Sequence, residues 1–266
     1  MNRGAKVAVA GLVAVAGAML VVIVTGPALV PHDPLATVAS PWSAPGKNLA
    51  LGTDSLGRDV VARVLAGGRD LTLIALGAAV VASALGVLSG LWAGWSTGWA
   101  TRLVRALADV ALVLPPLLVV LVVSVILPGP AAVIVGTVAT GAPLTLRLVG
   151  DATHDARQLD YVHAALLRGE STLSILLREV LPANARLVAG DLGLRTVVAL
   201  QVTAALHLLG LGPAPPTPDW ATMLVENLPG LGLNPAAVVA PALALAAVAG
   251  AVGALTHVVG NRSGAR

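Results

Sequence analysis

The chain has 266 residues, of which 57% are hydrophobic and only 11% are charged, and its mean hydropathy is +0.90. An ordinary soluble domain carries roughly 25% charged residues, so this composition excludes a water-soluble enzyme and predicts an all-α membrane protein. The net charge of +3 comes from Lys and Arg residues scattered between apolar blocks, which argues against nucleic acid as a partner. Cysteine is absent, which excludes disulfide bonds and thiolate chemistry.

Six apolar blocks predict a single transmembrane domain over residues 1–266. The first block follows Arg3 and Lys6, and a cleaved signal peptide is the alternative there, but its length favours a retained helix. Pro115 and Pro116 predict a kink inside the third block. The predicted spans are about 7–30, 71–100, 108–127, 131–147, 187–211 and 236–259.

Glycines recur every four residues through the second block. This spacing places them on one face of a helix, where the missing side chains allow another helix to approach closely. We therefore predict a helix-packing face there. It consists of Gly86, Gly90, Gly94 and Gly98.

The arginines indicate the topology. Most of them fall in the polar segments 1–6, 101–108, 147–186 and 260–266, which the positive-inside rule places in the cytoplasm. Both termini are then cytoplasmic, and residues 31–69 form an external loop that carries four basic residues as an exception.

Two charged residues lie inside the fifth block. Asp191 and Arg195 are one helical turn apart, which predicts a local ion pair at the membrane interface, with a gating role as the alternative. The five histidines form no closely spaced pair, so no metal site is predicted. No G-x-x-x-x-G-K-[ST] string occurs, so ATP must bind to another subunit.

The external loop contains a charged cluster at Asp54, Arg58 and Asp59. No nucleophile or base frames these carboxylates, which argues against catalysis. We interpret them as a structural network that holds the loop, with docking of a binding protein as the alternative.

The cytoplasmic loop 148–186 reads as a helix, a break at Gly169, a second short helix and a stop at Pro182. Leu173, Leu176 and Leu177 form an apolar stripe on the second helix. An amphipathic element of this size suits docking in a groove of a partner protein, and a helix lying on the membrane surface is the alternative.

The spacing A-A-x-x-x-G, followed by L-P, resembles the E-A-A loop of bacterial ATP-binding-cassette importer permeases. In that family the loop forms a coupling helix that docks on the ATPase. His163 stands where the family usually has Glu. The resemblance implies a coupling loop made of Tyr161, His163, Ala164, Ala165, Gly169, Leu173, Leu176, Leu177, Leu181 and Pro182.

Two further matches occur in the order in which the family has them. The string L-G-T-D-x-x-G-R-D at 51–59 is similar to a signature of the C-type permeases of the dipeptide, oligopeptide and nickel subfamily, and the stretch 208–224 resembles their L-G-L-G…P-P-x-P-x-W-x-x-M-L pattern. Gln201 and His207 are candidate pore contacts. The external signature residues are Gly52, Thr53, Asp54, Gly57, Arg58 and Asp59.

The resemblance implies a type I importer permease with six transmembrane helices in the bacterial inner membrane. Such a chain forms half of the pore for peptides or nickel chelates, with no enzymatic site and no cofactor of its own. A B-type permease, two ATP-binding subunits that use ATP, an extracytoplasmic substrate-binding protein and the lipid bilayer are the implied partners. The remaining alternatives are an ion-gradient-driven secondary transporter and a non-transport membrane assembly subunit.

Overall fold

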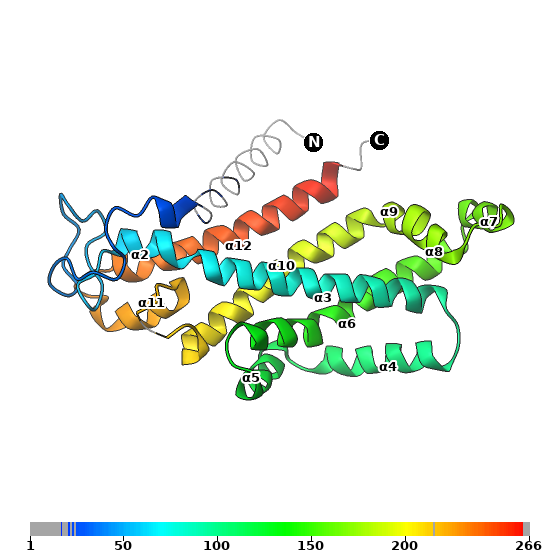
Figure 1. The fold of residues 1–266 in the computed structure, drawn as a ribbon, viewed down its shortest axis with the longest axis horizontal. Helices are drawn as coiled ribbons and strands as arrows, with labels where there is room; N and C mark the ends of the chain where they lie inside the picture. The colour runs from blue at the N-terminus through cyan, green and yellow to red at the C-terminus, as the bar shows by residue number, and fades with distance from the viewer. Residues whose placement is uncertain (1–16, 18–20, 22, 24, 215, 263–266) are drawn as a thin grey trace. The chain divides into compact units, whose positions relative to one another are not determined.

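The computed structural model describes residues 17, 21, 23, 25–214 and 216–262 (Figure 1). The first predicted span, 7–30, lies largely outside these residues. Within the described part of the chain the regular structure is helical, so the all-α prediction is confirmed. The longer helices are α3 (Arg69–Trp95), α4 (Trp99–Val113), α5 (Pro116–Ile126), α6 (Pro130–Ala156), α10 (Ala185–Leu206) and α12 (Ala236–Arg262). The short ones are η1 (Gly26–Ala28), α2 (Val60–Gly67), α7 (Asp160–Leu167), α8 (Thr172–Ile175), η2 (Leu176–Val180), α9 (Leu181–Ala183), η3 (His207–Leu211), α11 (Trp220–Asn227) and η4 (Leu228–Gly230).

Four helical stretches are long and apolar enough to cross a membrane, and the pair α4–α5 makes a fifth if it counts as one broken span. The four are Val60–Trp95, Pro130–Ala156, Ala185–Leu211 and Ala236–Thr256. This finding covers only the described residues, so six spans remains a prediction.

The kink predicted in the third block is confirmed, and the span predicted over 108–127 corresponds to a bent pair of helices, α4 and α5. Helices α4 and α5 meet at an angle of 97°. Leu114 has an extended backbone because the ring of Pro115 disfavours helical geometry in the residue before it. Pro115 is extended for the same reason, and Pro116 then begins α5 at the position that tolerates a missing N–H.

Two helix ends can be compared with the predicted spans. Helix α6 continues beyond the predicted span end at 147 to Ala156, in the polar loop that reads as a helix, and its polar residues find partners on α4. Arg147 pairs with Asp109, and Arg105 lies 3.5 Å from Asp151. Helix α3 stops at Trp95 rather than at 100, before Gly98 takes a positive φ of 138°.

The chain divides into two compact units. One contains the described residues up to Leu76, Pro128–Pro130 and Leu200–Leu255, and therefore the loop 31–59, α2, α11 and most of α12. The other contains Gly77–Leu127, Ala131–Ala199 and the described residues from Thr256, and therefore α4 to α9 with most of α3 and α10.

Three of the four predicted packing glycines lie against α6. A Cβ at Gly86 would overlap Thr145, one at Gly90 would lie 2.9 Å from Val149 Cβ, and one at Gly94 would overlap the backbone of Gly150. Gly98 does not belong to this face, because it follows α3 and a Cβ there would meet open space. The glycine face thus brings α3 and α6 together over about two turns of helix.

Replacing Gly90 by Ala is expected to destabilise the protein by about 1–3 kcal/mol, because the added methyl group overpacks the α3–α6 contact. Gly77→Ala is the matched control: it makes the same change in helix propensity on the same helix, with open space around the new Cβ. Thermal unfolding of the purified proteins in detergent checks this. Equal melting temperatures for the two variants would contradict the packing role.

Candidate functional site

The segment from residue 157 to residue 184, here called the α7–α9 segment, corresponds to the predicted coupling loop. Helix α7 ends in a Schellman motif. The N–H of Glu170 donates to the carbonyl of Ala165 (3.2 Å), and the N–H of Gly169 donates to that of Leu166 (3.0 Å). Gly169 has a φ of 77°, which the motif requires and which other residues adopt only with strain. The break predicted at Gly169 is therefore present.

Beyond the turn, Ser171 caps α8 by accepting a hydrogen bond from the N–H of Ser174 (3.3 Å). The chain then widens into the π-helical segment η2 just before Pro182. Proline has no N–H to donate to the carbonyl four residues earlier, and its ring would clash with that carbonyl. Asn184 closes the segment, its side-chain amide donating to the carbonyl of Val180 (3.0 Å), and α10 begins directly afterwards.

The inner face of the α7–α9 segment is a continuous hydrophobic cluster with the ends of α3 and α6. Its members on the segment are buried, and most of them have no exposed surface. The segment is thus packed as part of its unit rather than suspended from it. The buried cluster consists of Val87, Leu91, Val149, Ala156, Val162, Ala165, Ile175, Leu176 and Val180, with Trp95, Leu181 and Val188 packed against it.

The outer face holds only part of the predicted coupling loop. Tyr161, His163 and Ala164 are exposed, but Ala165 is buried. Leu167 was not among the predicted residues, yet 90% of its surface is exposed.

The predicted leucine stripe on α8 and η2 lies along α3 and is partly exposed, because Leu173 is 66% and Leu177 45% exposed. Leu176 is buried against α3, and Leu173 and Leu177 line a groove beside that helix. Leu181 packs against the cluster, and Pro182 is exposed. A stripe repeating with the helical period identifies a buried face but not the element that covers it.

Asp191 and Arg195 form the predicted ion pair, with 3.1 Å between Arg195 Nε and Asp191 Oδ1. Both residues are 5% exposed and buried among three helices, and their position at the membrane interface stays a prediction. From α6, the Thr145 hydroxyl donates to Asp191 Oδ2 (2.6 Å), and from α3, Ser83 Oγ lies 3.5 Å from the same oxygen. Gly141 on α6 leaves room for the arginine side chain. The pair therefore links α3, α6 and α10.

The external signature loop is organised around Asp54. Its Oδ2 accepts hydrogen bonds from Arg58 Nε (2.6 Å) and Arg63 Nη1 (2.5 Å), and both arginines also donate to Glu226. Asp54 and Arg63 have no exposed surface. Two carboxylates and two guanidinium groups thus connect the loop to α2 and α11. This arrangement agrees with the interpretation of the cluster as a structural network that holds the loop.

Other residues of the signature shape the loop. Gly52 and Gly57 have positive φ values, and a Cβ on either would overlap a backbone carbonyl. The Thr53 hydroxyl donates to the carbonyl of Ser40 (2.7 Å). Asp59 caps α2, accepting from the N–H of Val61, and its other oxygen lies 2.8 Å from His32 Nδ1. These contacts explain why the signature combines glycines with short polar side chains.

Burial alone would raise the pKa of Asp54, but hydrogen bonds from the N–H groups of Arg58 and Leu56 and from the Arg63 guanidinium outweigh it, so its pKa lies below the ordinary value of 3.8. A carboxyl with a lowered pKa stabilises the fold above its ordinary pKa, and this stabilisation is lost as the pH falls through the folded value.

We therefore expect the stability of the purified protein to fall as the pH drops below about 3.8. Asp54→Asn removes this acid-dependent part and costs about 3–5 kcal/mol at neutral pH, because it leaves two buried arginines with one carboxylate fewer. The exposed Asp33→Asn variant is the control. Unfolding temperatures measured from pH 3 to pH 7 check the effect. A decrease in unfolding temperature at low pH that is the same in Asp54→Asn as in wild type would contradict it.

The two candidate pore contacts lie in different surroundings. The side chain of Gln201 is exposed. His207 is buried in η3, and its Nδ1 lies 2.9 Å from Asp219 Oδ2. Asp219 also caps α11 by accepting from the N–H groups of Ala221 and Thr222. The His207–Asp219 contact therefore ties the end of α10 to the start of α11.

Sequence reasoning did not assign roles to Glu226, Asp219 or Thr145. A signal for Glu226 was present: the loop 31–69 carries an excess of basic residues, while the stretch 212–235 has acidic residues and no Lys or Arg. Among the described residues no group of three or more His, Cys, Asp or Glu side chains could hold a metal ion.

Comparison with known proteins gives a consistent result. Residues 86–263 match the family described as binding-protein-dependent transport system inner membrane component. The glutathione transport system permease protein GsiD of Pectobacterium atrosepticum is 34% identical over 196 residues, which cover 73% of this chain and 65% of that protein. The GsiD protein of Escherichia coli is 36% identical over 195 residues, 73% of this chain and 64% of that protein. The di/tripeptide transport system permease protein DppC of Pseudomonas aeruginosa is 36% identical over 226 residues, 77% of this chain and 74% of that protein.

The chain thus spans slightly less than two thirds of the length of the two glutathione permeases and about three quarters of the di/tripeptide permease. The family match includes α6, the α7–α9 segment and α10, which together hold the Schellman turn and the buried ion pair. From this match and these identities, the chain belongs to the family of binding-protein-dependent transport system inner membrane components.

Proposed function

We propose that this chain is a permease subunit of an ATP-driven importer for peptides in the bacterial inner membrane. The observation that carries the proposal is the construction of the α7–α9 segment. Its inner face is buried against α3 and α6, while α7 presents Tyr161, His163, Ala164 and Leu167 on its outer face. A partner that binds the outer face therefore displaces a segment that is packed against α3 and α6, and not a loosely attached loop.

The mechanism follows from this packing. An ATPase bound at α7 changes position when it binds and hydrolyses ATP. The buried cluster transmits the displacement to α3 and α6, and η2 and α9 lead directly into α10. ATP shifts the balance between outward-open and inward-open states because it binds the two states unequally. The chain holds no ATPase site, and ATP is used by its partners.

Membership of the family supports the remaining proposed partners. A second, B-type permease completes the pore, two ATP-binding subunits drive it, and an extracytoplasmic binding protein delivers the substrate to the external side, where the Asp54 cluster holds the loop. Both chain termini lie in the cytoplasm. The relatives named above carry glutathione and di- or tripeptides, which favours a peptide over a nickel chelate as the substrate.

Transport driven by a proton gradient uses ionisable groups that can titrate inside the membrane. In the described part of α10 the two buried charges, Asp191 and Arg195, are paired with each other. This pairing favours the ATP-driven mechanism over the secondary transporter.

Co-purification tests the proposal. The tagged chain is purified from detergent-solubilised membranes of its source cells, and ATP hydrolysis is measured in the eluate. We expect wild type to bring down an ATPase, and Leu167→Glu to lose most of it because a charge then stands on the outer face. Leu35→Glu makes the same substitution at an exposed leucine of the external loop and serves as the control. An eluate of wild type without ATPase would overturn the proposal.

A further inference from the structure

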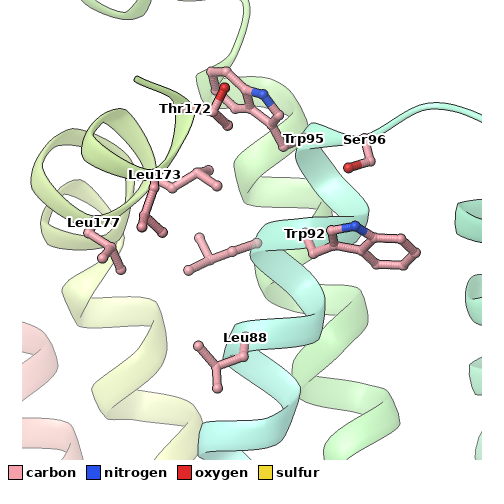
Figure 2. A pocket seen from close by; sticks show the side chains of 9 residues that line it. Leu88, Trp92, Trp95, Ser96, Thr172, Leu173 and Leu177 are labelled. Atoms are coloured by element: carbon pink, nitrogen blue, oxygen red, sulfur yellow. The ribbon is translucent and has the colours of Figure 1, made fainter. Parts of the chain in front are cut away.

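An apolar groove of about 240 Å³ lies between the end of α3 and the α8–η2 helix (Figure 2). Leu88 and Leu91 line it from α3, and Leu173 and Leu177 face them from α8 and η2. An engineered apolar cavity of about 150 Å³ is enough to take up benzene, so this groove has room for a stretch of hydrocarbon chain. Its lining offers such a chain a surface made almost entirely of leucine and tryptophan.

The position of the groove along α3 indicates what covers it. Helix α3 belongs to a stretch long and apolar enough to cross a membrane, and an exposed apolar strip runs along it from Val80 through Leu85 to Leu88. Trp92 and Trp95 follow in the last turn, before the helix ends. Tryptophan is enriched at the boundary between hydrocarbon and headgroups. The groove therefore begins in the hydrocarbon region and ends at the interface.

The interfacial end of the groove carries hydroxyl groups, and a guanidinium contacts the Trp95 ring that lines it. The hydroxyls of Ser96 and Thr172 lie there beside Trp95 (Figure 2). The Arg157 guanidinium stacks over the Trp95 ring, 5.4 Å from its centroid, and donates to the Trp95 carbonyl (2.8 Å). Arg157 forms no ion pair with a carboxylate within the described ranges of the chain, so its charge is available to a ligand.

We propose that the groove binds an acyl chain of an anionic phospholipid whose headgroup is held at the Arg157 end. The hydrocarbon fills the space between the leucines, and the two hydroxyls and the guanidinium meet the phosphate. Such a lipid lies between α3 and the α8–η2 helix. It is therefore part of the contact through which a displacement of the α7–α9 segment reaches α3. Only this effect on coupling rests on the proposed function, because lipid binding itself requires only that the protein is inserted in a membrane.

Native mass spectrometry of the purified full chain tests the proposal. The protein is equilibrated with equal amounts of phosphatidylglycerol and phosphatidylcholine, and the retained lipids are counted. We expect wild type to retain phosphatidylglycerol preferentially, and Arg157→Gln to reduce this preference about fivefold, the effect of one basic residue near an anionic lipid surface. Arg102→Gln is the control, since Arg102 is another exposed arginine near the same helix end.

A second variant tests the groove itself. Leu88→Trp combined with Leu173→Trp fills the space with side chains and is expected to abolish lipid retention. Leu118→Trp, at an exposed position on α5, leaves it unchanged. Equal losses in Arg157→Gln and Arg102→Gln, or full retention by the filled variant, would overturn the proposal. So would a filled variant that loses the ATPase but keeps its lipid, which would assign the groove to a protein. A chain that binds lipid but no ATPase would overturn only the proposed function.

Discussion

Gly169→Pro is expected to abolish ATP-driven uptake while the protein still inserts into the membrane. Gly169 has a φ of 77°, whereas the proline ring fixes φ near −65°. Proline also lacks the N–H that donates to the carbonyl of Leu166. The turn that places α8 after α7 is then lost, although the membrane-crossing helices are unchanged. Uptake of labelled peptide and the amount of inserted protein are measured together.

Gly169→Asn is the matched control for this substitution. A Cβ at position 169 meets open space, so the only cost is the strained backbone, and asparagine tolerates the left-handed conformation better than most residues. It also keeps the N–H. We expect Gly169→Asn to retain most of the uptake. Uptake by Gly169→Pro equal to that of wild type would show that the turn plays no part in coupling.

Replacing Asp191 by Leu is expected to destabilise the protein by about 3–5 kcal/mol, because Arg195 is then left buried and unpaired. The Thr145 hydroxyl also loses its acceptor. The double variant Asp191→Leu with Arg195→Met removes both charges and is expected to recover most of the stability, since buried ion pairs are often replaced by apolar residues at little cost. Thermal unfolding of the purified proteins measures both.

The double variant also separates a structural role from a gating role. If it folds like wild type and transports like wild type, the pair only holds α3, α6 and α10 together. If it folds but does not transport, the charges act in the transport cycle. A single variant Asp191→Leu as stable as wild type would contradict the burial of the pair.

Local sequence rules predicted the features of the fold that depend on one or two residues. Pro115 and Pro116 predicted the break between α4 and α5, because the constraint of proline on its own φ and on the preceding residue is local. The 97° angle at that break depends on what each helix packs against, and no local rule supplies it. The Gly169 turn was likewise predictable from one residue.

Features that depend on residues far apart in the chain were missed or misplaced. The predicted span ends at 147, and the pairing of Arg147 with Asp109 on α4 was not predicted. The leucine stripe of α8 and η2 was predicted to dock on a partner, and the burial of Leu176 against α3 was not predicted. Glu226 belongs to the charged cluster around Asp54, and the sequence did not predict this. In each case the deciding contact lies outside the window that periodicity can read.

The proposed function requires that this chain moves peptides with the free energy of ATP. The most direct test is uptake of labelled glutathione and dipeptide into proteoliposomes holding the complex that co-purifies with the chain, with ATP supplied on the side of the ATPase subunits. We expect uptake that requires ATP, continues when ion gradients are collapsed, and disappears in Gly169→Pro. Uptake driven by an ion gradient in the absence of ATP would contradict the account.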